Sequence, residues 1–159
     1  MPYARSARCL AALLFAWPLV ARSDGGENTR PPAEGATSHT LRVAAVQMRS
    51  TRDLSANVVR IREHLRRCAR EGVRVAVFPE CALTGYFAEA ITQRTATELA
   101  EAERQVGEAC RESNLYAIVG TPYRDGDRLL NSAVVFHPSG RVIERYHKIQ
   151  LAEAWPTPG

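Results

Sequence analysis

The chain has 159 residues, enough for one domain with its own hydrophobic core. Its composition, 45% apolar and 24% charged, excludes collagen, coiled coil and wholesale disorder. The net charge is +4, but Arg5, Arg8 and Arg22 lie in the first 22 residues, and the remaining 18 basic and 17 acidic side chains nearly balance. The arginines between residues 60 and 70 are interpreted as a solvated helix face, so no nucleic-acid partner is expected.

The first 23 residues have the layout of a secretory signal peptide. Arg5 and Arg8 give a positive start, and Cys9 to Val20 is an apolar stretch too short to span a membrane. Ala21 and Ser23 then place small side chains at the −3 and −1 positions of a cleavage site. We therefore expect a secreted or periplasmic protein with no membrane span after signal removal. A cytoplasmic protein that retains this segment is the alternative.

Residues 24–40 contain glycine and proline without an apolar period, which predicts a flexible linker before a domain over residues 41–159. Leu41 to Met48 is an apolar run that predicts a buried strand. Asp53 can cap a helix that ends at Gly72. The inward positions of that helix keep 3.6-residue spacing: Leu54, Val58, Ile61, Leu65 and Cys68. Val73 to Phe78 predicts a second buried strand.

A loop from Pro79 to about Arg94, with one short helical turn, is expected next. Thr95 and Glu98 form a capping box for a helix that runs through Glu112. Three strands joined by turns at 125–127 and 138–140 then resemble a meander. They are predicted over Leu115 to Thr121, Leu129 to Phe136 and Val142 to Tyr146.

Two strand–helix–strand units followed by hairpins predict an α/β layered domain with a mixed sheet. No glycine-rich phosphate loop follows the first strand, so a nucleotide site has little support.

The cysteines outside the signal give no disulfide framework, because there are three of them, an odd number: Cys68, Cys81 and Cys110. Cys68 and Cys110 fall on apolar helix faces. No Cys/His spacing suggests zinc. We expect no cofactor and no metal.

Two residues at predicted strand ends are candidates for chemistry. Glu80 follows a buried strand, where α/β domains place active sites, and partial desolvation is expected to raise its pKa toward neutrality, as suits a general base. Lys148 is the single lysine beside 20 arginines, and an amine at this strand end can stabilise an oxyanion. A solvated loop carboxylate and a surface lysine stay open as alternatives, and spacing cannot show that the two residues meet.

These residues lie in two recognisable segments. Phe78 to Tyr86, FPECALTGY, resembles the glutamate motif of the carbon–nitrogen hydrolase (nitrilase) superfamily, and Tyr146 to Leu151, YHKIQL, resembles its lysine motif. The resemblance runs from about Leu41 to Gly159. Supporting residues agree in order and spacing: Val46-Gln47 at the end of the first strand, Asn57 in the first helix, Gly120 after the third strand and Asn131 at the start of the fourth.

The resemblance implies the N-terminal half of such a hydrolase: half of a four-layer αββα sandwich with a mixed β-sheet, and a Glu-Lys-Cys triad. Glu80 would be the general base and Lys148 would stabilise the tetrahedral intermediate, while a cysteine forms a thioester that water cleaves. Glu153 is a candidate for a second glutamate, at shorter spacing than in the family. The family's cysteine falls beyond Gly159, and the neighbours of Cys81 do not resemble its motif. We therefore expect a truncated domain, inactive as it stands, whose nucleophile is outside this chain.

The implied reaction is thiol-dependent hydrolysis of a carbon–nitrogen bond other than a peptide bond, in a small-molecule amide or carbamoyl compound rather than a nitrile. An acyltransferase of the same superfamily is one alternative. A non-catalytic α/β interaction or binding module is another, and it predicts Glu80 and Lys148 far apart. Half a sandwich leaves an apolar sheet face uncovered. The resemblance leaves a homo-oligomer open at full length, because family members commonly pair.

Overall fold

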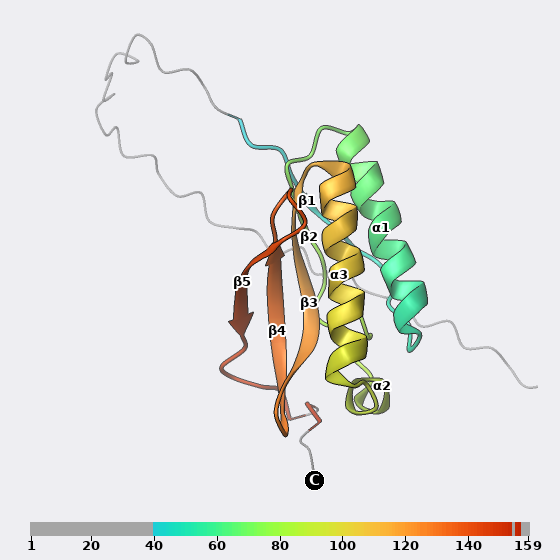
Figure 1. Ribbon diagram of the computed structural model, residues 1–159, viewed down its shortest axis with the longest axis vertical. Helices are drawn as coiled ribbons and strands as arrows, with labels where there is room; N and C mark the ends of the chain where they lie inside the picture. The colour runs from blue at the N-terminus through green and yellow to red at the C-terminus, as the bar shows by residue number, and fades with distance from the viewer. Residues whose placement is uncertain (1–39, 154, 157–159) are drawn as a thin grey trace, which may run out of the picture. The chain divides into compact units, whose positions relative to one another are not determined.

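The computed structural model describes residues 40–153, 155 and 156 (Figure 1). The predicted signal peptide and all but the last residue of the predicted linker lie outside this range. The described chain contains three helices and one five-stranded sheet. The helices are α1 (Leu54–Arg70), α2 (Ala88–Thr92) and α3 (Ala96–Ser113); the strands are β1 (Val43–Ala45), β2 (Val75–Val77), β3 (Tyr116–Asp125), β4 (Arg128–Phe136) and β5 (Val142–His147).

The sheet is mixed, as predicted. The strands lie in the order β1-β2-β3-β4-β5, with β1, β2 and β3 parallel and β3, β4 and β5 antiparallel. The two long helices, α1 in green and α3 in yellow, lie side by side on one face of the sheet (Figure 1). The predicted α/β class and the meander of the last three strands are both confirmed.

Both long helices begin at the predicted caps. Asp53 accepts a hydrogen bond from the Ala56 N–H at 3.1 Å, and Gly72, with φ +71°, follows the other end of α1. At α3 the Glu98 N–H donates to the Thr95 hydroxyl at 3.2 Å, and the Thr95 N–H donates to the Glu98 carboxylate at 2.8 Å. This reciprocal capping box satisfies two N–H groups that the helix leaves without partners.

The first two strands are shorter than predicted. Both strands are three residues long. β1 lies at the edge of the sheet and has β2 as its only neighbour in the described part of the chain, so its pairing is limited to the length of β2, Val75–Val77. Single hydrogen bonds continue the pairing: the Val46 N–H donates to the Val77 carbonyl and the Phe78 N–H to the Ile118 carbonyl, each at 2.8 Å. Strand length here depends on the partner and not on the apolar run itself.

The third strand is longer than predicted and continues past Thr121 to Asp125. Gly120 therefore lies inside β3 instead of after it, and Asn131 lies inside β4 instead of starting it. Beyond Ile118, β3 pairs with β4 alone. A strand with one neighbour tolerates Pro122, which has no N–H to donate.

The hydrophobic core lies between the sheet and the two long helices. Ile61 and Leu65 of α1, Val106 of α3, Val119 of β3 and Phe136 of β4 are all fully buried there. Burial of each such side chain contributes about 1.5–3 kcal/mol. The thiols predicted on the inward helix faces, Cys68 and Cys110, are in this core. No helix in the described range is long and apolar enough to cross a membrane.

The opposite face of the sheet is open in the described part of the chain and is apolar, as expected. Strand register places Val43, Val77, Ile118, Ala133 and Tyr146 on this face, alternating with residues that point to the helices. Val43 is 60%, Val77 40% and Tyr146 59% exposed. We call it the open face.

Candidate active site

Glu80 follows β2 at the carboxyl end of the parallel strands. The chain leaves the sheet after Phe78 and crosses directly over Gly120 of β3. A Cβ atom at Gly120 would lie 2.6 Å from the Glu80 Cα and 2.7 Å from the Cys81 nitrogen, closer than real contacts allow. Glycine at position 120 therefore permits the main chain of Glu80 to rest on the sheet.

The loop after Glu80 is tied to the start of α1 by a buried asparagine. The Asn57 side-chain amide donates to the Leu83 carbonyl at 2.9 Å and to the Thr51 carbonyl at 2.7 Å. Its oxygen accepts from the Thr51 N–H at 2.8 Å. Asn57 is completely buried and joins the two loops, and its bond to Leu83 gives a partner to a buried carbonyl.

Lys148 follows β5, and its position is fixed by β4. Its main-chain N–H donates to the Asn131 carbonyl at 2.8 Å. Farther along, Trp155 is buried and its indole N–H donates to the Leu129 carbonyl at 3.0 Å. Its ring also packs edge-on against Tyr86, in the loop after Glu80. Sequence reasoning missed Trp155, although a tryptophan shortly after the lysine segment is a candidate anchor.

The structure brings Glu80 and Lys148 together across 68 positions of sequence. The Lys148 Nζ lies 3.0 Å from the Glu80 Oε1, and the side-chain amide of Asn131 donates to the same oxygen. A cavity of about 290 Å³ lies beside them on the open face. Apolar side chains, including Val77 and Ile118, and the ring of Tyr146 line it together with these three polar residues and Ser132. Sequence reasoning used Asn131 as a marker of order and did not foresee its contact with Glu80.

The electrostatics of Glu80 differ from the prediction. Burial is the largest single influence and pushes its pKa upward, but the hydrogen bonds from Lys148 and Asn131 and the lysine charge outweigh it, so the pKa is lowered. The predicted rise toward neutrality is therefore wrong, because donors from distant strands were not visible in the sequence. The pKa of Lys148 is raised, chiefly by its hydrogen bond to Glu80. Both groups are charged at neutral pH.

Cys81, although next to Glu80 in sequence, lies in the interior. Its side chain is fully buried with Ile91, Leu129 and Trp155, and its φ of +51° turns the chain sharply at this point. Burial, and then the nearby charge of Glu80, raise the pKa of the Cys81 thiol to about 12. A thiol in this state is a poor nucleophile at neutral pH.

Glu153 is exposed and makes no ion pair or hydrogen bond with other residues that the structure describes. The structure does not bring its side chain to the Glu80–Lys148 pair, and its tentative role stays a prediction. Within the described range no group of three or more His, Cys, Asp or Glu residues is arranged to hold a metal ion.

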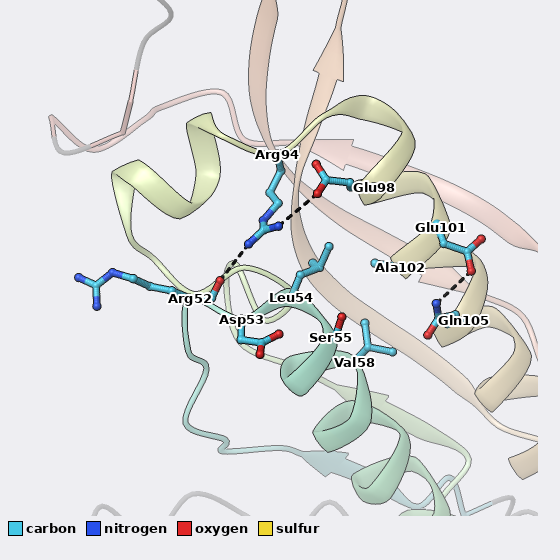
Figure 2. Close-up of a pocket in the computed structure, with 10 residues that line it drawn as sticks. All are labelled: Arg52, Asp53, Leu54, Ser55, Val58, Arg94, Glu98, Glu101, Ala102 and Gln105. Atoms are coloured by element: carbon cyan, nitrogen blue, oxygen red, sulfur yellow. Dashed lines mark hydrogen bonds and ion pairs between the residues drawn. The ribbon is translucent and has the colours of Figure 1, made fainter.

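A larger cavity, of about 520 Å³, lies elsewhere, between the start of α1 and α3 (Figure 2). Arg94 bridges the Arg52 carbonyl and the Glu98 carboxylate there, each at 3.2 Å. Figure 2 shows these two interactions and the Glu101–Gln105 hydrogen bond on α3. The polar side chains that line this larger cavity are largely engaged with one another or with helix caps. None of the predicted site residues lines this cavity. The smaller cavity beside Glu80 is therefore the candidate active site.

Comparison with known proteins identifies the family of the chain. Residues 42–159 match the model of the family described as carbon-nitrogen hydrolase, so the chain belongs to the carbon–nitrogen hydrolase family. The match includes both segments that resemble the family's glutamate and lysine motifs.

Curated relatives are longer than this chain. The chain is 29% identical over 113 residues to the omega-amidase NIT2 of Homo sapiens, covering 70% of this chain and 41% of the relative. It is 32% identical over 118 residues to a nitrilase of Pyrococcus abyssi, covering 70% and 44%. It thus spans less than half the length of these relatives.

Solved structures show the same fold. The NitN amidase of Nesterenkonia sp. AN1 superposes with a TM-score of 0.69 at 23% sequence identity, over 76% of this chain and 50% of that one. A variant of this amidase from the nitrilase superfamily, bound to butyramide, gives a TM-score of 0.68 at 22% identity, over 75% and 48%. The mixed sheet with its helices corresponds to part of a nitrilase-fold domain.

Proposed function

We propose that this chain supplies the glutamate and lysine of a thiol-dependent hydrolase that cleaves carbon–nitrogen bonds other than peptide bonds. The contact between the Lys148 Nζ and the Glu80 Oε1 at 3.0 Å, beside a cavity on the open face, carries the proposal. A binding module without catalysis gives no reason for these two groups to share a cavity. The closeness of the pair therefore favours the hydrolase over that alternative.

The proposed chemistry gives each of the two charged groups its own role. The Glu80 carboxylate accepts the proton of a cysteine thiol, and the thiolate attacks the carbonyl carbon of the amide. The Lys148 ammonium stabilises the negative charge that develops on the carbonyl oxygen. The amine leaves with a proton returned from Glu80, which gives a thioester. Glu80 then takes a proton from water, which hydrolyses the thioester and releases the carboxylic acid and the thiol.

We propose that the thiol comes from outside this sequence. Cys68, Cys81 and Cys110 are all buried, and burial is the main cause that raises the pKa of each. The solved structures with this fold support an external source. One of them carries a product of acrylamide addition at its active site cysteine, and this chain covers 50% of that protein.

The proposed substrate is a small amide. The omega-amidase relatives and the amidase bound to butyramide support this class. A nitrile is the second candidate, supported by the nitrilase of Pyrococcus abyssi at 32% identity. The two are distinguished by the substrate, since hydrolysis of butyramide and hydrolysis of butyronitrile both release ammonia but start from different compounds.

The experiment combines this chain with a polypeptide that carries the remaining part of a related amidase, including its cysteine. We expect ammonia release from butyramide with both polypeptides present and none with this chain alone. Glu80→Gln and Lys148→Met should each abolish it, whereas Glu89→Gln, which changes an exposed carboxylate on α2, should not. Full activity of Glu80→Gln, or hydrolysis by this chain alone, contradicts the proposal.

We also propose export from the cytoplasm, on the layout of residues 1–23. N-terminal sequencing of the protein from the cell envelope or the medium tests it. Cleavage near Asp24 supports export, and an intact Met1 in the cytoplasmic fraction contradicts it.

A further inference from the structure

Asn131 contacts both charged residues of the site with two different groups. Its side-chain amide donates to the Glu80 Oε1, and its main-chain carbonyl accepts from the Lys148 N–H at 2.8 Å. The residue lies inside β4 and is only 4% exposed. We infer that Asn131 is a positioning residue that fixes Glu80 and Lys148 as one unit and leaves the Glu80 Oε2 as the basic atom. The inference rests on the proposed function.

The two oxygens of Glu80 have different surroundings. Lys148 and Asn131 both donate to Oε1, and no other residue in the described part of the chain donates to Oε2. An ionised carboxylate has about four lone-pair sites, two on each oxygen. Two donors occupy the lone pairs of Oε1, so the lone pairs of Oε2 are free to accept the proton of the thiol.

Two donors restrict the orientation of the Glu80 carboxylate, whereas one donor alone would not. The last torsion of a glutamate side chain is broad and nearly two-fold, so Lys148 alone, on a long flexible stem, could hold either oxygen. The Asn131 amide comes from a paired strand and has little freedom. Its NH₂ group must face the ionised Glu80, because the carboxylate only accepts hydrogen bonds. The second donor therefore selects which oxygen is held and which is presented.

The arrangement also fixes Lys148. Its N–H is held by the carbonyl of Asn131, while its ammonium meets the oxygen held by the Asn131 side chain. One residue of β4 thus sets the main chain of the lysine and the partner of its amine. The ionisable groups beside the pair are Cys81, Tyr86 and, in the lining of the same cavity, Tyr146, and a substitution at Asn131 replaces none of them.

The first test measures the pKa of the Glu80 carboxyl by NMR titration of this chain alone, so that it does not depend on catalysis. Asn131→Ala removes one donor and should raise that pKa. Asn131→Asp keeps the size of the side chain, adds a like charge and should raise it further. Asn114→Gly is the matched control: it replaces an asparagine of left-handed conformation far from Glu80 in sequence, and the pKa should not move. An unchanged pKa in both Asn131 variants overturns the inference.

The second test uses the combined polypeptides of the activity experiment. Because misplacement of a base by about 1 Å can cost 10²-fold in rate, Asn131→Ala should lower kcat by about 10²-fold with little change in KM. A raised pKa with unchanged kcat overturns the positioning role. If the unsubstituted polypeptides release no ammonia, the proposed function fails, and the pKa measurement alone decides whether Asn131 holds Glu80.

Discussion

The main chain of Glu80 rests on Gly120, with its Cα only 2.6 Å from the position that a Cβ at Gly120 would take. The atoms in the way belong to the backbone of residues 79–81, which cannot move aside as the end of a flexible side chain can. The carboxylate is thus placed by a close approach of two backbones, and the hydrogen bonds to Lys148 and Asn131 act on a segment already held in place.

Gly120→Ala should push this segment away from the sheet. Overpacking of this kind costs typically about 1–3 kcal/mol of unfolding free energy, which urea denaturation followed by circular dichroism measures. The variant should also lengthen the Glu80–Lys148 contact in a crystal structure. Gly126→Ala is the control, because a Cβ there meets nothing within 4 Å although φ is +60°. It should lose some stability and leave the contact intact; a displaced contact in both variants would argue against the close approach as its cause.

The pH dependence of stability should report the Glu80–Lys148 contact. The pKa of Glu80 is lowered in the folded chain, so its contribution is present above the ordinary value of 4.5 and is lost as the pH falls through the folded value. The pKa of Lys148 is raised, so its contribution is present below 10.5 and is lost as the pH rises through the folded value.

Urea denaturation at a series of pH values measures this dependence. Glu80→Gln should flatten the acid limb of the stability curve, and Lys148→Met should move the acid midpoint upward. Both effects should be small and weaken in high salt, because the two side chains are 44% and 39% exposed. An acid limb identical in all three proteins would show that the contact is not populated in solution.

The sequence predicted those elements that local chemistry determines. The cap at Asp53 and the box at Thr95 and Glu98 have nearby partners, so they mark helix starts correctly. Strand ends depend on neighbours far along the chain, which is why β3 was predicted too short and β1 too long. No periodicity in the sequence shows that β3 has a neighbouring strand on only one side at Pro122.

The site was predicted in part, for the same reason. The residue types and motifs identified Glu80 and Lys148, but their meeting depends on the pairing of β4 with β5. The direction of the Glu80 pKa was wrong because burial was considered without the donors of Lys148 and Asn131, which lie 68 and 51 positions away.

The thiols in the described range should resist alkylation in the folded protein. Burial raises the pKa of Cys81 and of Cys110 to about 12, and it also raises that of Cys68. Because thiolate is the reactive form, iodoacetamide at pH 7.5 should label these positions slowly in buffer and rapidly in urea. Mass spectrometry of the peptides resolves each position. Rapid labelling of native Cys81 would make Cys81 a candidate for the nucleophile again.

A buried ion pair anchors the strand that leads to Lys148. The Arg145 guanidinium of β5 donates to both carboxylate oxygens of Glu103 of α3, at 3.0 and 2.6 Å, and it lies 4.3 Å from the centre of the Tyr123 ring. The two side chains are 18% and 10% exposed. Such a pair is costly to break on one side, because the other charge is then buried without a partner.

Glu103→Gln should therefore lower the unfolding free energy by about 3 kcal/mol. The double variant Glu103→Leu, Arg145→Leu should recover part of this loss, since it leaves neither charge behind. Glu101→Gln is the matched control on the same helix, where the pair with Arg104 is exposed and its loss should not change stability measurably. Because Lys148 directly follows β5, the Glu103→Gln variant should also weaken the Glu80–Lys148 contact, seen as a rise in the Glu80 pKa by NMR. Equal stability of the two single variants would show that the Arg145–Glu103 pair does not hold β5 against α3.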